Sequence, residues 1–146
     1  KEYRRQRQMC IRDRVRECRR KKIEVRPVPG PNAAVTALAC SGLPTHQFLY
    51  LGFLPKKSAG AQKVLDSWKH FEGSIIIYES KHRIEKTLLG IIDTLGPERF
   101  ICLSKELTKI HETFHVGKAL EVLEKMKTSS SKGEFTLVLA PEGYSL

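Results

Sequence analysis

The sequence predicts an α/β protein whose mixed sheet is covered by helices. Segments typical of strands occur in turn with longer segments in which apolar residues recur every three or four positions, as in amphipathic helices. The segment 74–78 is apolar on both faces, which is typical of a strand covered on each side. With 40% hydrophobic and 29% charged residues, the 146-residue chain has enough apolar content to bury a core.

The expected elements follow one another from residue 23. Strands are expected where residues alternate in polarity or are wholly apolar, at 23–28, 48–53, 74–78, 99–103, 112–116 and 135–140. Helices are expected from their apolar spacing at 33–41, 61–71, 82–95 and 118–126. Asn32 stands at the N-cap of the first helix and Ser80 can cap the third. Gly42 and Gly96 are placed to end helices.

The positive charge is concentrated at the start of the chain. The net charge is +10, and residues 1–26 hold 12 Lys and Arg against four Asp and Glu, so the remainder is almost neutral. Such a segment is typical of an arm that binds nucleic acid or a membrane surface. We prefer to interpret residues 1–22 as a leader that is non-native or disordered. The composition of residues 1–14 shares nothing with the rest of the chain and resembles a translated sequencing adapter.

Several classes of protein are excluded by simple patterns. No apolar run is longer than that at 75–78, which is far too short to cross a bilayer, and no export signal is present. The four cysteines show no metal-site spacing, and Cys40 and Cys102 are expected to be free thiols in a reducing compartment. We therefore expect a cytoplasmic protein with no membrane partner. Because the chain begins with Lys1, it is either processed or a piece of a longer protein.

Residues 111–115 read His-Glu-Thr-Phe-His, which matches the HExxH signature of zinc proteases. That site requires a helix, since only there do histidines four positions apart reach one ion. Thr113, Phe114 and Val116 favour a strand, in which the two histidines would be about 13 Å apart. We therefore expect no metal site.

Polar residues follow two of the expected strands, at Tyr78-Glu79-Ser80 and at 104–108. Ligands of α/β sheets bind beyond the carboxyl ends of strands, so these residues are candidates to share one crevice. The alternative is structural, with Ser80 as a helix cap and Lys105 and Glu106 in a solvated turn. The loop 29–33 opens a helix whose free N–H groups can hold a polar ligand, or it is a plain turn.

Five sequence blocks resemble those of the ribosomal small-subunit RNA methyltransferase I family. They read PGPNAA followed by SGLP, then GFLP, YESKHR, ELTK with a later Glu, and GEF, at 29–34 with 41–44, 52–55, 78–83, 106–109 with 112, and 133–135. The order of the blocks is that of the family. Lys81 replaces a proline of the family pattern.

The resemblance implies the tetrapyrrole-methylase fold, in which two α/β domains hold S-adenosylmethionine in the cleft between them. It also implies methylation of the ribose 2′-oxygen of a cytidine in small-subunit ribosomal RNA, by an enzyme expected to be a homodimer. The glycine-rich front half of the family has no counterpart here. We therefore expect residues 23–54 to be a remnant of the N-terminal domain and residues 55–146 to be the C-terminal α/β domain.

The resemblance also assigns roles to individual residues. The cofactor is expected to contact residues at the strand ends and the first helix, namely Pro31, Asn32, Ala33, Tyr78, Glu79, Leu107 and Thr108. Ribosomal RNA is expected to meet side chains that are mostly cationic, namely Lys81, His82, Arg83, Lys105 and Lys109. Three carboxylates are candidates for the base that accepts the hydroxyl proton, namely Glu79, Glu106 and Glu112. The sequence does not choose among them.

Two other functions stay open. The chain could be a non-catalytic RNA-binding module, or it could belong to a tetrapyrrole methylase of the same fold. The YESKHR and ELTK blocks argue against the second of these alternatives. With one wall of the cofactor cleft missing, the chain alone is expected to be inactive.

Overall fold

The computed structural model describes residues 2–128 and 133–146 of the chain. Its one sheet is mixed and has the strand order β1-β2-β5-β3-β4. The strands are β1 (Phe48–Phe53), β2 (Ser74–Ser80), β3 (Phe100–Lys105), β4 (Thr113–Lys118) and β5 (Glu134–Leu139). β1 and β2 are parallel, whereas β5 runs antiparallel to both β2 and β3, and β4 runs antiparallel to β3. The expected α/β class with a mixed sheet is confirmed.

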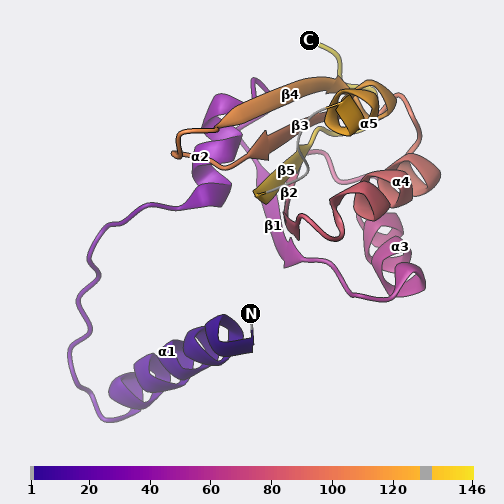
Figure 1. Ribbon diagram of the computed structural model, residues 1–146. Coiled ribbons are helices and arrows are strands. Elements are labelled where there is room, and N and C mark those ends of the chain that lie inside the picture. Colours follow the sequence, from indigo (N-terminus) through magenta and orange to yellow (C-terminus); the bar gives the residue numbers. More distant parts are fainter. Residues whose placement is uncertain (1, 129–132) are drawn as a thin grey trace. The chain divides into compact units, whose positions relative to one another are not determined.

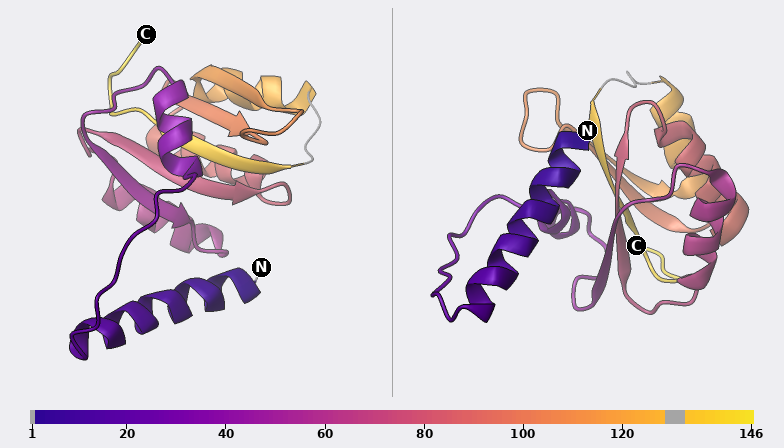
Figure 2. Two further views of the ribbon diagram at one scale, coloured as in Figure 1. Left: turned by 90° about the vertical axis from the view of Figure 1, so that its left-hand side faces the viewer. Right: turned by 90° about the horizontal axis from the view of Figure 1, so that it is seen from below.

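Helices cover both faces of this sheet. They are α2 (Ala33–Cys40), α3 (Ser58–Ser67), α4 (Ile84–Leu95) and α5 (Ala119–Thr128). α2 packs on one face, over β5 and β2, whereas α3, α4 and α5 gather on the other (Figures 1 and 2). In the described residues, no helix is long and apolar enough to cross a membrane.

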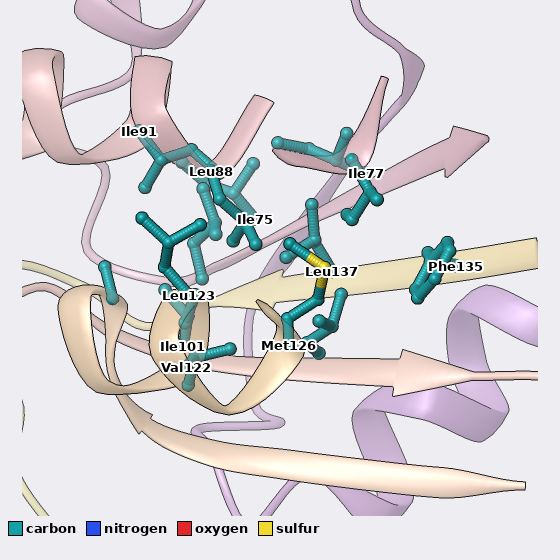
Figure 3. Packing of buried hydrophobic residues seen from close by; sticks show 14 of the residues in the cluster. Ile75, Ile77, Leu88, Ile91, Ile101, Val122, Leu123, Met126, Phe135 and Leu137 are labelled. Carbon is teal, nitrogen blue, oxygen red and sulfur yellow. The ribbon is translucent and has the colours of Figure 1, made fainter. Parts of the chain in front are cut away.

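The alternation of side chains along β2 divides the apolar core into two layers. Ile75 and Ile77 point to the side of α3, α4 and α5, where they meet Leu88, Leu123 and Leu137 (Figure 3). Ile76, between them, points to the α2 side. All three isoleucines are at most 1% exposed. The prediction that this strand is buried on both faces is confirmed.

The carboxyl ends of β1, β2 and β3 lie along the same side of the sheet, where these strands end, and this side is called the edge of the sheet below. β1 is parallel to β2, and β5 runs opposite to both β2 and β3, so these three strands point the same way. In the register, Glu79 at the end of β2 and Lys105 at the end of β3 both stand opposite Phe135. Two strand spacings therefore separate their backbones, roughly 10 Å.

The helix ends agree with the sequence in three of four cases, one of which is Gly42, which follows the end of α2 with a positive φ of 72°. The Asn32 side chain accepts hydrogen bonds from the backbone N–H of Ala34 (3.0 Å) and Val35 (3.3 Å), which makes it the expected N-cap. Gly96 ends α4 at a positive φ of 95°. Ser80 does not cap α4, because it is the last residue of β2, and the N-cap is Arg83 without a side-chain bond. The second expected helix, α3, also begins earlier than expected, at Ser58.

The chain up to Pro31 forms a unit of its own. The segment expected to be a leader contains a helix, α1 (Glu2–Arg20), where no regular element was expected from the sequence. Arg, Gln, Glu and Met favour helices, and Glu17 lies 3.6 Å from Arg20 and 3.5 Å from Lys21 within this unit. The strand expected at 23–28 is absent, and these described residues form no regular element. Whether the leader is native stays a prediction.

The second unit runs from Asn32 to Leu146. It contains α2 and β1, which were expected in a remnant separate from residues 55–146. β1 pairs with β2 from Phe48 to Phe53, with a register shift between Tyr50 and Gly52, and α2 packs on β5 and β2. All of them therefore belong to the same packed body. To which domain of a longer protein residues 23–54 belong stays a prediction.

Candidate functional site

The start of α2 lies beside two strand ends on one face of the sheet. Ala34, in the first turn of α2, is a member of the buried cluster on that face. Tyr78 at the end of β2 and Leu107 after β3 are partly buried and pack against the same cluster. Asn32 and Ala33 open the helix next to them and are exposed. The structure thus brings most of the expected cofactor residues to one face and one edge. Pro31 belongs to the other unit.

Tyr78 is also part of an aromatic group on the edge strand. Its ring meets those of Tyr50 at 5.1 Å and Phe53 at 5.9 Å between centroids, both edge to face. Burial and the neighbouring Tyr78 raise the pKa of Tyr50. Tyr50 and Phe53 are nevertheless 49% and 50% exposed. The result is a largely uncovered aromatic surface beside the strand end.

Glu79 points to the opposite face from Tyr78 and its side chain is fully buried. One carboxylate oxygen accepts a bond from the backbone N–H of Ser80 (2.8 Å), and the other from the Thr87 hydroxyl (2.9 Å). The second oxygen also lies 3.3 Å from Nη2 of Arg83. Glu79 therefore ties the end of β2 to α4. The alternation of side chains along β2 was a sequence signal for the burial of Glu79, because it places Glu79 on the same face as Ile75 and Ile77.

Arg83 is held from two sides. The same Nη2 that faces Glu79 donates to the carbonyl oxygens of Leu54 (3.1 Å) and Pro55 (3.0 Å) in the connection after β1. These contacts join the ends of β1 and β2, and the Arg83 side chain is only 26% exposed. Lys81 and His82, in the turn just before it, are exposed at the same edge.

The loop after β3 is closed by the carboxylate of Glu106. Its Oε1 accepts a bond from the backbone N–H of Glu134 (2.7 Å) and from Nζ of Lys109 (2.9 Å). Lys109 also lies 3.5 Å from the Glu134 carboxylate. The bond from Lys109 and that from the Glu134 backbone lower the pKa of Glu106, and the bond to Glu106 raises the pKa of Lys109. The ELTK and GEF blocks therefore meet in space.

The rest of that loop is fixed by Glu112, whose carboxylate accepts the backbone N–H of Thr108. Thr108 has a positive φ of 64°, and its hydroxyl donates to the carbonyl of Leu107 (2.6 Å). The final Glu of the ELTK block thus holds the backbone of Thr108 in a conformation that few non-glycine residues adopt. Both Thr108 and Glu112 are exposed.

Lys105 differs from the other expected RNA-binding residues in its burial, since it is only 8% exposed and its side chain is on the opposite face from that of Ser104. His115, on the neighbouring strand β4, has its pKa lowered by burial and by Lys125 and Lys105. Residues 113–115 of the HExxH match are in β4, so the expected strand is confirmed. In the described part of the chain, no group of three His, Cys, Asp or Glu residues could hold a metal ion.

Comparison with known proteins gives a consistent result. The family model for the tetrapyrrole (corrin/porphyrin) methylases matches residues 11–123, and so begins inside the segment set aside as a leader. The chain is similar to the ribosomal RNA small subunit methyltransferase I of Escherichia coli O157:H7, with 42% identity over 130 residues, or 89% of this chain and 46% of that protein. The protein of the same name from Halalkalibacterium halodurans is 40% identical over 83% of this chain and 42% of its own length.

Solved structures show the same fold at low sequence identity. The methyltransferase CobJ has a TM-score of 0.60 and 18% identity, over 86% of this chain and 54% of CobJ. Uroporphyrin-III C-methyl transferase from Thermus thermophilus, complexed with S-adenosylhomocysteine, has a TM-score of 0.53 and 17% identity, over 86% of this chain and 57% of that one. This chain spans about half the length of the curated relatives that it matches.

Proposed function

Because the chain belongs to the tetrapyrrole (corrin/porphyrin) methylase family, we propose that it is part of an S-adenosylmethionine-dependent methyltransferase. The substrate proposed is small-subunit ribosomal RNA, with the methyl group going to the ribose 2′-oxygen of a cytidine. The observation that carries this proposal is the 42% identity over 130 residues to a protein named for small-subunit ribosomal RNA methylation. A cytoplasmic location and a homodimer are proposed with it.

The residues present fit one wall of a site for S-adenosylmethionine. Tyr78 and Leu107 offer apolar surface beside the start of α2, where the first-turn residue Ala33 is exposed. Sites for drug-sized ligands are commonly about 300–1,000 Å³ and enclose most of the ligand. A cavity between α3 and α4 is smaller, about 190 Å³. The second wall is therefore proposed to come from outside this chain.

When bound, the cofactor supplies an electrophilic methyl group, and this chain's part is to position it and the acceptor hydroxyl. That hydroxyl must lose its proton to a base. Glu79 is fully buried with both oxygens bonded, and Glu106 is engaged by Lys109 and has a lowered pKa. Glu112 is exposed and is bonded through only one oxygen in the described structure. Of the three candidates, Glu112 is therefore the one we propose.

RNA contacts are proposed at the same edge. Lys81 and His82 are exposed in the turn after β2, and Lys109 is exposed in the loop after β3. Cations at such positions can neutralise backbone phosphates, which makes the affinity depend on salt. Arg83 and Lys105 are less accessible, and we propose only a secondary contribution from them.

The test is a methyl-transfer assay with the gene's upstream sequence included. The longer protein is incubated with radiolabelled S-adenosylmethionine and either unmodified small-subunit ribosomal RNA or a porphyrinoid. We expect label in the RNA, at a ribose 2′-oxygen, and a large loss of rate with Glu112→Gln. Label in the porphyrinoid alone would favour the tetrapyrrole-methylase alternative. RNA binding without any transfer would favour the non-catalytic RNA-binding module.

A further inference from the structure

A cavity of about 190 Å³ lies between α3 and α4, and the connection after β1 also lines it. Three cations line it, Lys56, Arg83 and Lys86, against a single acid, Asp93. α3 and α4 pack against each other along the same face of the sheet (Figures 1 and 2). Arg83 was predicted from the sequence as a functional residue, whereas Lys56 and Lys86 were missed, because the cavity exists only once these two helices meet.

The cations of this cavity are available to a ligand. In the described part of the chain, neither Lys56 nor Lys86 has an ion-pair partner within 4.0 Å. Arg83 uses Nη2 for Glu79 and two carbonyl groups, so its Nε and Nη1 have no partner among the described residues. These contacts fix the guanidinium in place before a ligand arrives, which lowers the entropy cost of binding. Ser58 adds a further polar residue to the lining.

The size and the charge of the cavity restrict the ligand. Its volume is below the range of about 300–1,000 Å³ for sites that enclose drug-sized molecules, so a nucleoside would not fit inside. A tetrahedral oxyanion is smaller, and Arg and Lys side chains are its usual protein partners. Leu54, which follows β1 in the chain, and Arg83, which follows β2, both line the cavity. The cavity is therefore near the strand ends, where Lys81 and His82 are exposed.

We propose that this cavity binds one phosphate group of the RNA backbone and so fixes the position of the strand that reaches the edge of the sheet. The inference rests on the proposed function, since it takes RNA as the partner. A phosphate contact positions nucleic acid without reading its sequence. The cavity should therefore contribute to affinity equally for RNAs of different sequence.

The test compares two double variants of the full chain for binding to a fluorescein-labelled single-stranded RNA. Lys56→Gln/Lys86→Gln removes two cations of the cavity, and Lys125→Gln/Lys127→Gln removes two exposed cations of α5 as a matched control. We expect the cavity variant to bind about tenfold more weakly at low salt. The slope of log affinity against log salt should become shallower by about 0.7, which is the value for the loss of one neutralised phosphate on a single strand. The control should stay within about twofold of the parent chain.

A titration followed by amide NMR separates the possible ligands. RNA should shift the signals of Ser58 and Thr87 in the parent chain but not in the cavity variant, and inorganic phosphate should shift the same signals more weakly. Equal loss of affinity in both double variants, or binding of inorganic phosphate without binding of RNA in the cavity, would overturn the inference. If the cavity variant binds RNA with the same affinity as the parent chain, this inference alone is refuted. If the parent chain does not bind RNA, the result counts against the proposed function as well.

Discussion

Gly133 lies directly against the side chain of Glu106, so that a Cβ at position 133 would be 2.7 Å from the Glu106 Cγ. Gly133 also has a φ of +128°, which side chains rarely adopt. The same Glu106 carboxylate accepts the N–H of Glu134, the next residue. The glycine before β5 and the glutamate after β3 are therefore parts of one packed unit.

We expect Gly133→Ala to lower the free energy of unfolding by about 1–3 kcal/mol, through backbone strain and the displaced Glu106 carboxylate. Urea denaturation measures the change. Gly90→Ala is the control, because Gly90 is inside α4 and a Cβ at that position would have no atom within 4 Å, so it should gain up to about 1 kcal/mol. Equal stability of the two variants would show that the contact with Glu106 costs nothing.

Arg83→Ala should destabilise the fold by about 2–3 kcal/mol, because it leaves the carboxylate of Glu79 buried without its cation. This value is below that of a wholly buried pair, since Arg83 is partly exposed. Thermal or urea unfolding provides the measurement. The double variant Glu79→Gln/Arg83→Met removes both charges and should be more stable than Arg83→Ala. Full stability of Arg83→Ala would show that the ion pair with Glu79 contributes nothing to the stability of the fold.

The lowered pKa of Glu106 predicts a loss of stability in acid. A carboxyl group whose pKa is lower in the folded state stabilises that state above its unfolded pKa of about 4.3, and the contribution is lost as the pH falls through the folded value. Glu106→Gln should therefore reduce the difference in urea midpoint between pH 7 and pH values of about 3. Glu124→Gln, an exposed residue of α5, is the control. An unchanged difference in Glu106→Gln would refute the assignment.

The sequence predicted the sheet and most helix ends because the signals for them are local. The alternation around Ile76 and the capping side chain of Asn32 are properties of a few neighbouring residues. The strand expected at the described residues 23–28 is absent, because a segment of alternating polarity forms a strand only where a partner strand can bond to its backbone N–H and C=O groups. The site was less predictable, since Glu79 bonds to Thr87 in α4 and Glu106 bonds to the backbone of Glu134 in β5. Such contacts depend on tertiary packing. The sequence nevertheless indicated that Glu79 is buried, because it follows Ile77 by two residues and so is on the same face of the strand.

The exposed aromatic surface of β1 predicts self-association of this chain. Tyr50 and Phe53 are about half exposed on an edge strand, and large apolar surfaces at such edges favour pairing with another molecule. Sedimentation velocity should show larger species as the concentration rises, and Tyr50→Ser/Phe53→Ser should reduce them. Ile110→Ser is the control, because Ile110 is 97% exposed but isolated in a loop. Equal effects of the two changes would refute the aromatic surface as the cause.

The last prediction is that this chain, taken alone, binds S-adenosylmethionine weakly and transfers no methyl group. A pocket for such a ligand normally buries 70–90% or more of its surface. Here the described residues offer only the surface around Ala33, Tyr78 and Leu107, on one side of the ligand. Loss of the second wall removes both contact area and preorganisation. Isothermal titration of the chain should therefore give no saturable heat, whereas the longer protein should bind one equivalent. One-to-one binding at micromolar affinity by the chain alone would show that these residues build a complete cofactor site.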